Sequence, residues 1–483
     1  MLYNRVSFFI FLWFMAQKCP TIFMLGIAGA GMAALARILH LKSYRILGYD
    51  QNQNTTCAAL GDLGVDINHD MADVDFSGVD QLVYSSAFSL EHPLMIKAKQ
   101  AGISCVSRAR CLADCMQGYE QIAIAGSHGK STIAALLCYM LQQQAFMPSY
   151  AIGAPIAQTT FQGHVDEGQH FIFEADESQN ELSYYAPQKV LLSNISADHL
   201  GAYGNNFDAL LDQMHTWLSQ LDQEALLVYN QDDPHLADIV PGLTCKRITY
   251  GCSAASDARI EAYRTESGFS YWNVSYQGRS YALSLPMPGL YNAYNATGAF
   301  IMAIALGACP DALLQDTQRF PGLYRRAMAC AKYRFASGHH QVLADYGHHP
   351  KEIQAYYHAL KTRSDTKLCV VFQPHRYSRT KALWQDFVRV LSEMDKLILL
   401  DIYAADEAKD AGVSSYGLFQ DLQKTMKNVY YCPDKAHLYT LLNQVLEAKD
   451  TIVLQGAGDV FFIPQHYAWQ EYALQNSKMG VIK

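Results

Sequence analysis

A glycine turn that ends in lysine, Gly126-Ser-His-Gly-Lys-Ser-Thr132, restricts the fold of this chain more than any other segment. The apolar run Gln121–Ala125 before it predicts a strand, and Ile133–Gln143 after it predicts a helix. Such a turn aims backbone N–H groups and the positive end of the helix at one point, which suits a phosphate. Lys130 adds a mobile positive charge, and the hydroxyls that follow it can bind magnesium. The segment therefore predicts an α/β domain that binds a nucleoside triphosphate.

The spacing of this turn differs from the standard phosphate loop, G-x-x-x-x-G-K-[ST]. That pattern requires glycine at position 124, where this chain has Ile124. The alternative is an ordinary strand–turn–helix corner that contains Gly-Lys-Ser. The strand and helix expected on either side favour the phosphate loop.

Length, charge and cysteine content limit the remaining possibilities. A chain of 483 residues predicts about three domains. Its formal net charge is −8 and it has no long basic run, which argues against a nucleic-acid-binding surface. The 12 cysteines include no C-x-x-C pair, and we expect Cys111 and Cys115 to be free thiols in a reducing compartment, the cytoplasm.

The N-terminal apolar run Val6–Met15 is too short to span a bilayer as a helix. No A-x-A-like cleavage site follows it, so we expect neither a signal peptide nor stable membrane insertion. A strand is predicted to begin soon afterwards, at Thr21. We therefore expect native translation to start at Met15.

The first block of the chain, to about Gly118, predicts a Rossmann-type unit. A strand at Thr21–Leu25 leads into the glycine turn Gly26-Ile-Ala-Gly-Ala-Gly31 and a helix at Met32–Leu41. A second strand at Tyr44–Tyr49 ends at Asp50, an acidic residue placed to meet a ribose. Position 28 is alanine where the dinucleotide pattern has glycine. Spacing alone therefore leaves a dinucleotide and a UDP-sugar equally open.

Two further blocks alternate strands and helices, which predicts mostly parallel sheets. In the second block we expect an antiparallel excursion at Tyr263–Leu285 and a helix at Asn292–Leu306. The third block is expected to contain helices at Lys351–Lys361 and Lys381–Leu391. The remaining predicted strands are Gln81–Ser85, His170–Phe173, Val190–Ser193, Leu226–Tyr229, Gln341–Ala344, Leu368–Phe372, Lys396–Leu400, Val429–Cys432 and Thr451–Leu454.

Carboxylates and a histidine follow two strands of the second block. Glu174-Ala-Asp-Glu177 is a candidate magnesium site, because hard cations prefer carboxylate oxygen; the alternative is a solvated acidic turn. Asp198-His199 could serve a metal or a phosphate, or be structural. Asn292 and Asn295 could recognise adenine, or Asn292 could cap a helix.

Basic residues form two further candidate groups. Arg325-Arg326 could be a solvated pair, or one guanidinium could clamp a transferring phosphoryl group. His348-His349 and the pair Arg376 and Arg379 follow neighbouring predicted strands. Two cationic clusters at one sheet edge repel each other unless an anion lies between them, and a carboxylate substrate would fit.

Taken in order, these motifs resemble the Mur ligase family of peptidoglycan synthesis, and within it the branch that adds L-alanine to UDP-N-acetylmuramate. The likeness runs through essentially the whole chain. The matching stretches are Gly26–Met32, Gly126–Thr132, Glu174–Ser178, Ala197–His199, Asn292 with Asn295, Arg325-Arg326, Asp345–Pro350, Phe372–Thr380 and Gln455–Gly458.

The resemblance implies an α/β fold of three domains. A Rossmann-like UDP-sugar domain is expected at 1–118, with 1–14 outside the native chain. A central P-loop-type ATPase domain with a small antiparallel excursion is expected at 119–317. A Rossmann-like amino-acid-binding domain is expected at 318–483. The substrates implied are UDP-N-acetylmuramate, L-alanine and ATP, with Mg²⁺ as cofactor; the resemblance leaves monomer and homodimer open.

The resemblance also implies a mechanism and site residues. The lactyl carboxylate attacks the γ-phosphate of ATP, and the amine of L-alanine then attacks the acyl phosphate. The implied catalytic residues are Lys130, His199, Arg326 and His348. The implied ATP contacts are Gly126, Ser127, His128, Gly129, Lys130, Ser131, Thr132, Asn292, Asn295, Arg326 and Asp345. The implied magnesium ligands are Ser131, Glu174 and His199. The implied substrate contacts are Gly26, Ala28, Gly29, Ala30, Gly31, Asp50, Tyr346, His348, Arg376 and Arg379.

Several positions depart from the family pattern, namely Gln179–Glu181, Gly201, Tyr291, Pro321, Leu323-Tyr324 and Ala405-Asp406. They leave three alternatives. The nearest is the related ligase that recycles an intact tripeptide, although Tyr346-Gly347 favours L-alanine because that ligase usually has Phe-Ala there. A non-catalytic UDP-sugar or nucleotide sensor is the second. A nicotinamide oxidoreductase, the third, would rest on the first glycine turn alone.

Overall fold

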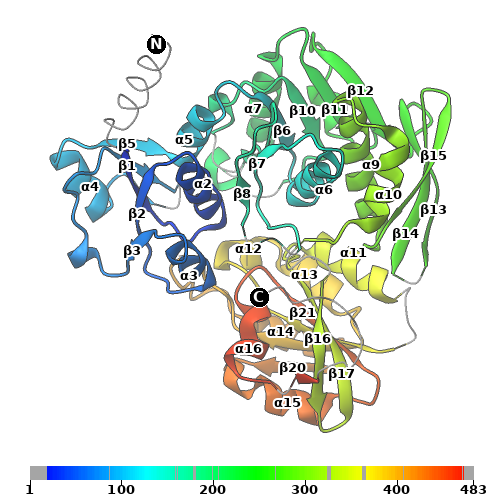
Figure 1. Ribbon diagram of the computed structural model, residues 1–483. Coiled ribbons are helices and arrows are strands. Elements are labelled where there is room, and N and C mark those ends of the chain that lie inside the picture. The colour runs from blue at the N-terminus through cyan, green and yellow to red at the C-terminus, as the bar shows by residue number, and fades with distance from the viewer. Residues whose placement is uncertain are drawn as a thin grey trace, which may run out of the picture. The chain divides into compact units, whose positions relative to one another are not determined.

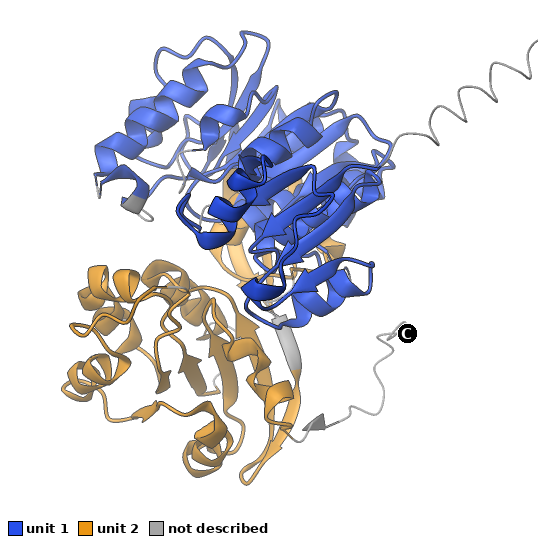
Figure 2. Cartoon of the chain, turned by 90° about the vertical axis from the view of Figure 1, so that its left-hand side faces the viewer, with its two compact units in different colours: residues 1–259, 275–279, 295–316 blue, residues 260–274, 280–294, 317–483 orange. Residues whose placement is uncertain are grey.

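The computed structural model describes residues 19–85, 88–157, 159, 161–177, 181–197, 200–204, 206–266, 268–323, 328–361, 366–405, 407–469 and 471–472. Within these ranges the chain forms three β-sheets with helices between the strands (Figure 1). The chain divides into two compact units, coloured separately in Figure 2. One unit comprises residues 1–259, 275–279 and 295–316, and the other comprises 260–274, 280–294 and 317–483.

The first sheet, in the described part of the chain, has five strands in the order β3-β2-β1-β4-β5, all parallel. Its strands are β1 (Thr21–Leu25), β2 (Arg45–Tyr49), β3 (Asp66–Asn68), β4 (Gln81–Tyr84) and β5 (Ser104–Ser107). Its helices are α2 (Ala30–Leu41), α3 (Thr55–Gly61), α4 (Pro93–Gln100) and α5 (Arg108–Cys115). The strand order reverses at β1, so the glycine turn after β1 lies at the switch point where open α/β sheets bind ligands.

The second sheet, counted over the described residues, has ten strands in the order β15-β14-β13-β12-β11-β10-β6-β9-β7-β8. The strands are β6 (Glu120–Ala125), β7 (Ser149–Ala151), β8 (Gly163–His164), β9 (His170–Glu174), β10 (Lys189–Leu192), β11 (Leu226–Asn230), β12 (Lys246–Gly251), β13 (Ala258–Glu266), β14 (Phe269–Tyr276) and β15 (Arg279–Leu285). The accompanying helices are α6 (Lys130–Gln143), α7 (Phe207–Ser219), α8 (Leu236–Ile239), α9 (Leu290–Ala305) and α10 (Pro310–Arg319). The central strand β6 lies between β10 and β9 and runs parallel to both.

The third sheet has seven strands in the described residues, in the order β20-β19-β18-β21-β17-β16-β22. The strands are β16 (Met328–Phe335), β17 (Gly338–Asp345), β18 (Leu368–Phe372), β19 (Lys396–Leu400), β20 (Val429–Cys432), β21 (Thr451–Gln455) and β22 (Glu471–Tyr472). The helices are α11 (Pro350–Lys361), α12 (Tyr377–Ala382), α13 (Trp384–Leu391), α14 (Ser415–Gln423), α15 (Leu438–Val445) and α16 (Ile463–His466). Every residue of β18 and β19 is buried, as expected for parallel strands covered on both faces.

The predicted strands are confirmed to within a few residues. The segment predicted as an antiparallel excursion forms the neighbouring strands β13, β14 and β15, and each is followed by the next after only two residues, as in β-hairpins. Three predictions about helices were wrong. The helix after the phosphate loop begins at Lys130, not Ile133, because Gly129 at φ 85° ends the turn there. The helix expected at Lys381–Leu391 is broken at Leu383 into α12 and α13. The capping interpretation of Asn292 fails because α9 begins two residues earlier, at Leu290.

Several predicted features lie outside the described residues. They include the apolar run at the N-terminus, Gln179, Asp198-His199, Tyr324, Arg325-Arg326 and Asp406. A search of the described residues finds no helix with both the length and the apolar character needed to cross a bilayer.

Candidate active site

The predicted phosphate loop, Gly126–Thr132, lies at the junction of β6 and α6. At two of its glycines any other residue would collide with neighbouring atoms. Gly126 has φ 123°, and a Cβ there would lie 2.4 Å from Ser193 Oγ. Gly129 has φ 85°, and a Cβ there would lie 2.5 Å from Asn295 Oδ1. Ile124, where the standard pattern has glycine, is fully buried within β6. The turn therefore begins two residues later than in the standard loop, at Gly126.

The end of β10 holds this loop in place. Asn194 Oδ1 accepts a hydrogen bond from His128 N at 2.9 Å, and Ser193 Oγ donates to His128 O at 2.9 Å. Ser127 N donates to Asn194 O at 2.9 Å. Ser193 and Asn194 belong to no motif recognised in the sequence and were not predicted as site residues. Their position at the carboxyl end of the strand beside β6 was the available signal.

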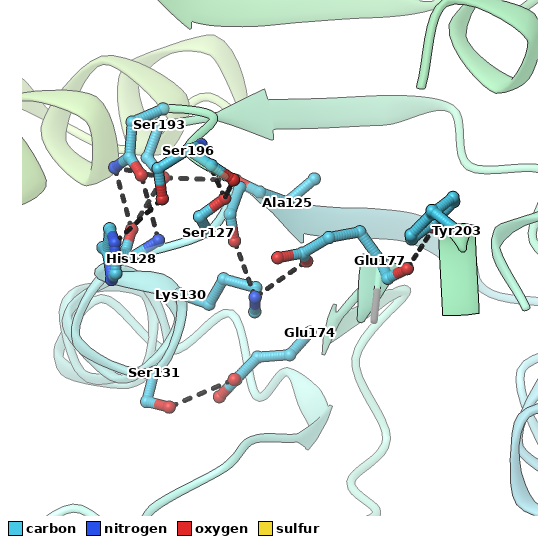
Figure 3. A network of polar contacts seen from close by, with 12 residues as sticks. Ala125, Ser127, His128, Lys130, Ser131, Glu174, Glu177, Ser193, Ser196 and Tyr203 are labelled. Atoms are coloured by element: carbon cyan, nitrogen blue, oxygen red, sulfur yellow. Dashed lines mark hydrogen bonds and ion pairs between the residues drawn. The ribbon is translucent and has the colours of Figure 1, made fainter. Parts of the chain in front are cut away.

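Lys130 is the first residue of α6, and its ammonium group has two partners (Figure 3). Nζ donates to Gly126 O at 2.6 Å and to Glu177 Oε2 at 2.8 Å. Burial alone would lower the pKa of Lys130, but the negative charges of Glu177, Asp176 and Glu174 raise it above its ordinary value. Lys130 is therefore a permanently charged cation at the mouth of the loop.

Ser131 and Glu174 lie together, as expected for two ligands of one hard cation. Ser131 Oγ donates to Glu174 Oε2 at 3.1 Å (Figure 3), while Glu174 Oε1 accepts from Gly153 N. A Cβ on Gly153 would lie 2.7 Å from Ser131 Oγ, so glycine at 153 permits this close approach. Hydroxyl and carboxylate oxygens fit Mg²⁺, which needs few protein ligands when phosphate supplies others. Within the described ranges no three His, Cys, Asp or Glu side chains group around one point, and His199 lies outside those ranges.

A cavity of about 310 Å³ connects the first glycine turn with the phosphate loop. Its lining residues are Gly29, Ala30, Gly31, Met32, Ala34, Ser85, Arg108, Leu112, Lys130, Ala151, Ile152, Gly153, Glu174 and Asp176. The turn thus shares one cavity with Lys130 and Glu174, which follow it by about 100 and about 145 residues in the sequence.

Arg108 also lines this cavity and was not predicted from the sequence. It begins α5 directly after β5, and its side-chain atoms lie 3.2–3.3 Å from the position that a Cβ on Gly31 would occupy. Its guanidinium group is therefore close to the N-terminal end of α2, which also attracts anions. The available signal was again a polar residue at the carboxyl end of a parallel strand.

Asp50 lies beside the first glycine turn, as expected, but both its oxygens have partners within the chain. Oδ2 accepts from Ala28 N at 2.9 Å and Oδ1 accepts from Asn52 N at 3.0 Å. The side chain is 7% exposed. These contacts hold Ala28 and its turn against the end of β2.

The two asparagines predicted to meet adenosine are buried in the first two turns of α9. Asn292 Nδ2 donates to Pro288 O at 2.8 Å. The Oδ1 atom of Asn295 lies against Gly129, as described above. Asn295 therefore lies against the phosphate loop. Arg326, the predicted γ-phosphate contact, is outside the described residues.

Three predicted residues of the second unit follow β17. Asp345 Oδ2 accepts from Gln455 Nε2 at 2.8 Å and from Gly347 N at 2.8 Å. The rings of Tyr346 and His348 meet edge to face, with centroids 5.6 Å apart.

The arginines after β18 differ in environment. Arg379 is buried, and its guanidinium group donates to His375 Nδ1 at 3.2 Å. The His375 ring lies 5.7 Å from the His348 ring and stacks on Tyr403 at 5.6 Å, so Arg379 and His348 belong to one cluster. The exposed Arg376 has φ 72°, a conformation that non-glycine residues rarely adopt. His375 and Tyr403 are cluster members that the sequence analysis had not assigned to the site.

Comparison with known proteins adds independent findings. Three family models match in order: the Mur ligase family catalytic domain over residues 21–120, the Mur ligase middle domain over 124–303, and the Mur ligase glutamate ligase domain over 333–458. A UDP-N-acetylmuramate–L-alanine ligase of Coxiella burnetii is 35% identical over 442 residues, which cover 90% of this chain and 95% of the relative. This chain is a Mur ligase.

Solved structures support the fold of this Mur ligase. The UDP-N-acetylmuramate–alanine ligase MurC of Thermotoga maritima has a TM-score of 0.80 at 21% identity, covering 93% of this chain and 98% of the other. A murein peptide ligase of Psychrobacter arcticus has a TM-score of 0.71 at 20% identity, with the same coverage. The predicted three-domain α/β fold is confirmed.

Proposed function

We propose that this Mur ligase joins L-alanine to the lactyl carboxylate of UDP-N-acetylmuramate, with ATP converted to ADP and phosphate. The observation that carries the proposal is the cavity that connects the first glycine turn with Lys130 and Glu174. A nucleotide-sugar bound at the turn would direct its carboxylate toward the phosphate loop. The similarity to the L-alanine ligase of Coxiella burnetii supports the choice of substrates. Because the reaction consumes ATP, we assign it to the cytoplasm.

In the first step, a lactyl oxygen attacks the γ-phosphorus of ATP, the bond to ADP breaks, and an acyl phosphate forms. The task of the protein is positioning and charge neutralisation, as in other phosphoryl transfers. Lys130, with the backbone of Gly126–Thr132, binds the phosphates. Magnesium, bound by Ser131, Glu174 and His199, would neutralise phosphate charge, and Arg326 would reach the γ-phosphate. Arg108 would bind the diphosphate of the sugar nucleotide beside Gly31.

In the second step, the amine of L-alanine attacks the acyl carbon, and phosphate leaves as the amide forms. The carboxylate of L-alanine suits the cluster of Arg379, His375 and His348, because a guanidinium group pairs well with carboxylate. Tyr346 and Arg376 would complete this pocket. We further propose the domain boundaries 1–118, 119–317 and 318–483 for UDP-sugar, ATP and amino acid.

The tripeptide-recycling ligase is the second candidate, because a murein peptide ligase has a similar fold. Gly347 argues for L-alanine. A Cβ at this position would lie 2.6 Å from Asp345 Oδ2 and 2.9 Å from Gln455 Nε2, so the alanine usual in the recycling ligase does not fit here without rearrangement. A panel of L-alanine, glycine, L-serine and tripeptide distinguishes the two candidates; turnover with tripeptide alone would favour the second.

Phosphate release should require all substrates together. We expect a coupled assay to show turnover with UDP-N-acetylmuramate, L-alanine, ATP and Mg²⁺, and only background release when any one is omitted. Release that does not depend on the amino acid would contradict the ligase proposal. Binding of UDP-N-acetylmuramate or ATP without any phosphate release would favour the alternative of a non-catalytic UDP-sugar or nucleotide sensor.

Replacing Arg379 by alanine should raise the KM for L-alanine about 100-fold, because a buried charge-assisted hydrogen bond to the substrate is lost. The KM for ATP should change little. Arg389→Ala is the matched control, since Arg389 forms an exposed pair with Asp386 in the same unit. Equal effects of Arg379→Ala on both KM values would contradict the assignment, and initial-rate kinetics with each substrate varied measure the difference.

A further inference from the structure

The cation of the phosphate loop is held by a buried carboxylate that the mechanism above does not use. Lys130 Nζ and Glu177 Oε2 are 2.8 Å apart, and the two side chains are 14% and 2% exposed. The same Nζ donates to Gly126 O at 2.6 Å (Figure 3). Two acceptors therefore fix the direction of the ammonium group.

Glu177 is itself held in position. It lies three residues beyond the end of β9, and its backbone oxygen accepts from the hydroxyl of Tyr203, in the short helix η4 (Leu200–Tyr203) (Figure 3). Its second carboxylate oxygen, Oε1, is buried and has no hydrogen-bond partner in the described part of the chain. Burying a carboxylate with one oxygen unsatisfied is costly, and such a group calls for an explanation.

The carboxylates at the end of β9 and just after it have different partners. Glu174 meets Ser131, whereas Glu177 meets Lys130. Burial raises the pKa of Glu177 and the positive charge of Lys130 acts against this rise, while the negative charge of Glu177 raises the pKa of Lys130. The sequence had suggested a magnesium site or a solvated acidic turn for these carboxylates, and neither interpretation includes an ion pair with Lys130.

We propose that Glu177 is a positioning residue, which together with Gly126 O aims the Lys130 ammonium group at the site of the transferring phosphoryl group. This inference rests on the proposed function, because it assumes that the loop binds ATP. Without Glu177, the ammonium group would still attract ATP over a distance but would lose its fixed direction. The loss should therefore fall on the chemical step rather than on binding.

The test is a double-mutant cycle with Lys130→Ala and Glu177→Gln, which measures whether the two side chains act as one unit. Alone, Glu177→Gln should lower kcat about 30-fold and change the Kd for ATP, measured by calorimetry, by less than about threefold. When Lys130 is already replaced by alanine, adding Glu177→Gln should lower the Kd for ATP about tenfold, because the second substitution removes an unpaired buried carboxylate that repels phosphate.

Thermal unfolding of the nucleotide-free protein measures the coupling between Lys130 and Glu177 without ATP. Lys130→Ala should lower the midpoint of thermal unfolding, and adding Glu177→Gln should restore part of that loss, since the double variant buries no lone charge. Glu177→Asp keeps the negative charge, but the side chain is one methylene shorter and places the carboxylate farther from Lys130 Nζ. The kcat of this variant should therefore lie between those of wild type and Glu177→Gln. This variant also serves if the glutamine variant does not fold.

The matched control is a second buried ion pair, Lys396 with Asp450, whose atoms are 2.7 Å apart and whose side chains are each 3% exposed. Asp450→Asn should lower thermal stability without altering the kcat of the folded fraction. Wild-type kcat in Glu177→Gln, or an equal change in ATP affinity in both Lys130 backgrounds, would overturn the inference. A wild-type protein that binds no ATP would instead contradict the proposed function.

Discussion

Lys130→Ala should nearly abolish formation of the acyl phosphate, so that kcat falls about a thousandfold, while the sugar nucleotide still binds. The ammonium group of Lys130 bonds to Gly126 O within the predicted phosphate loop and to Glu177. In the proposed reaction it would stabilise the charge that develops on the transferring phosphoryl group. The glycine turn before α2 and Arg108 remain in place at the other end of the cavity. Trapping of the acyl phosphate with hydroxylamine and calorimetry with UDP-N-acetylmuramate measure the two effects separately.

A suitable control for this variant is Lys246→Ala. Lys246 pairs with Glu224 on the surface of the same unit, where the two side chains are 60% and 81% exposed. Exposed pairs of this kind contribute little to stability, so wild-type kinetics are expected. Normal turnover in Lys130→Ala would refute the role assigned to the loop.

Glu174→Gln should lower kcat about 100-fold and raise the concentration of Mg²⁺ needed for half-maximal phosphate release. The substitution keeps the shape of the side chain and leaves one oxygen to accept from Gly153 N, but removes the negative charge beside Ser131. Titration of Mg²⁺ at saturating ATP measures both effects.

Glu224→Gln is the control for this second variant, because it removes a carboxylate from the exposed pair with Lys246. Its Mg²⁺ dependence should match that of wild type. If Glu174→Gln lowered kcat with an unchanged Mg²⁺ dependence, Glu174 would have to act by other means than metal binding.

The sheets could be predicted because their strands are continuous apolar runs. Thr21–Leu25, Leu368–Phe372, Lys396–Leu400 and Val429–Cys432 have in the structure the bounds expected from the sequence. Polar residues at the carboxyl ends of neighbouring parallel strands, such as β17 and β21, could be predicted to lie close together, since such strands end at one edge of the sheet. Asp345 and Gln455, separated by 110 residues in the chain, are indeed hydrogen-bonded.

Other site residues depend on where a side chain points, which residue order alone does not fix. The sequence indicates three carboxylates at Glu174–Glu177, but not that Glu174 contacts Ser131 while Glu177 contacts Lys130. Arg108 follows a short strand of low hydrophobicity and belongs to no motif considered. The predicted helix boundaries were wrong where the conformation of a single residue sets the start of the helix, as Gly129 does with its positive φ.

The hydrogen bonds from β10 to the phosphate loop have a consequence for recognising such loops. Gly126 and Gly129 allow neighbouring atoms to approach the turn closely. Ser193 and Asn194, more than sixty residues later, form hydrogen bonds with His128 that stabilise the turn. The functional signature is thus split between two distant segments. The standard pattern demands glycine at position 124 and would pass over this loop, whereas a pattern that pairs G-x-x-G-K with a Ser-Asn dipeptide directly after the adjacent strand would find it.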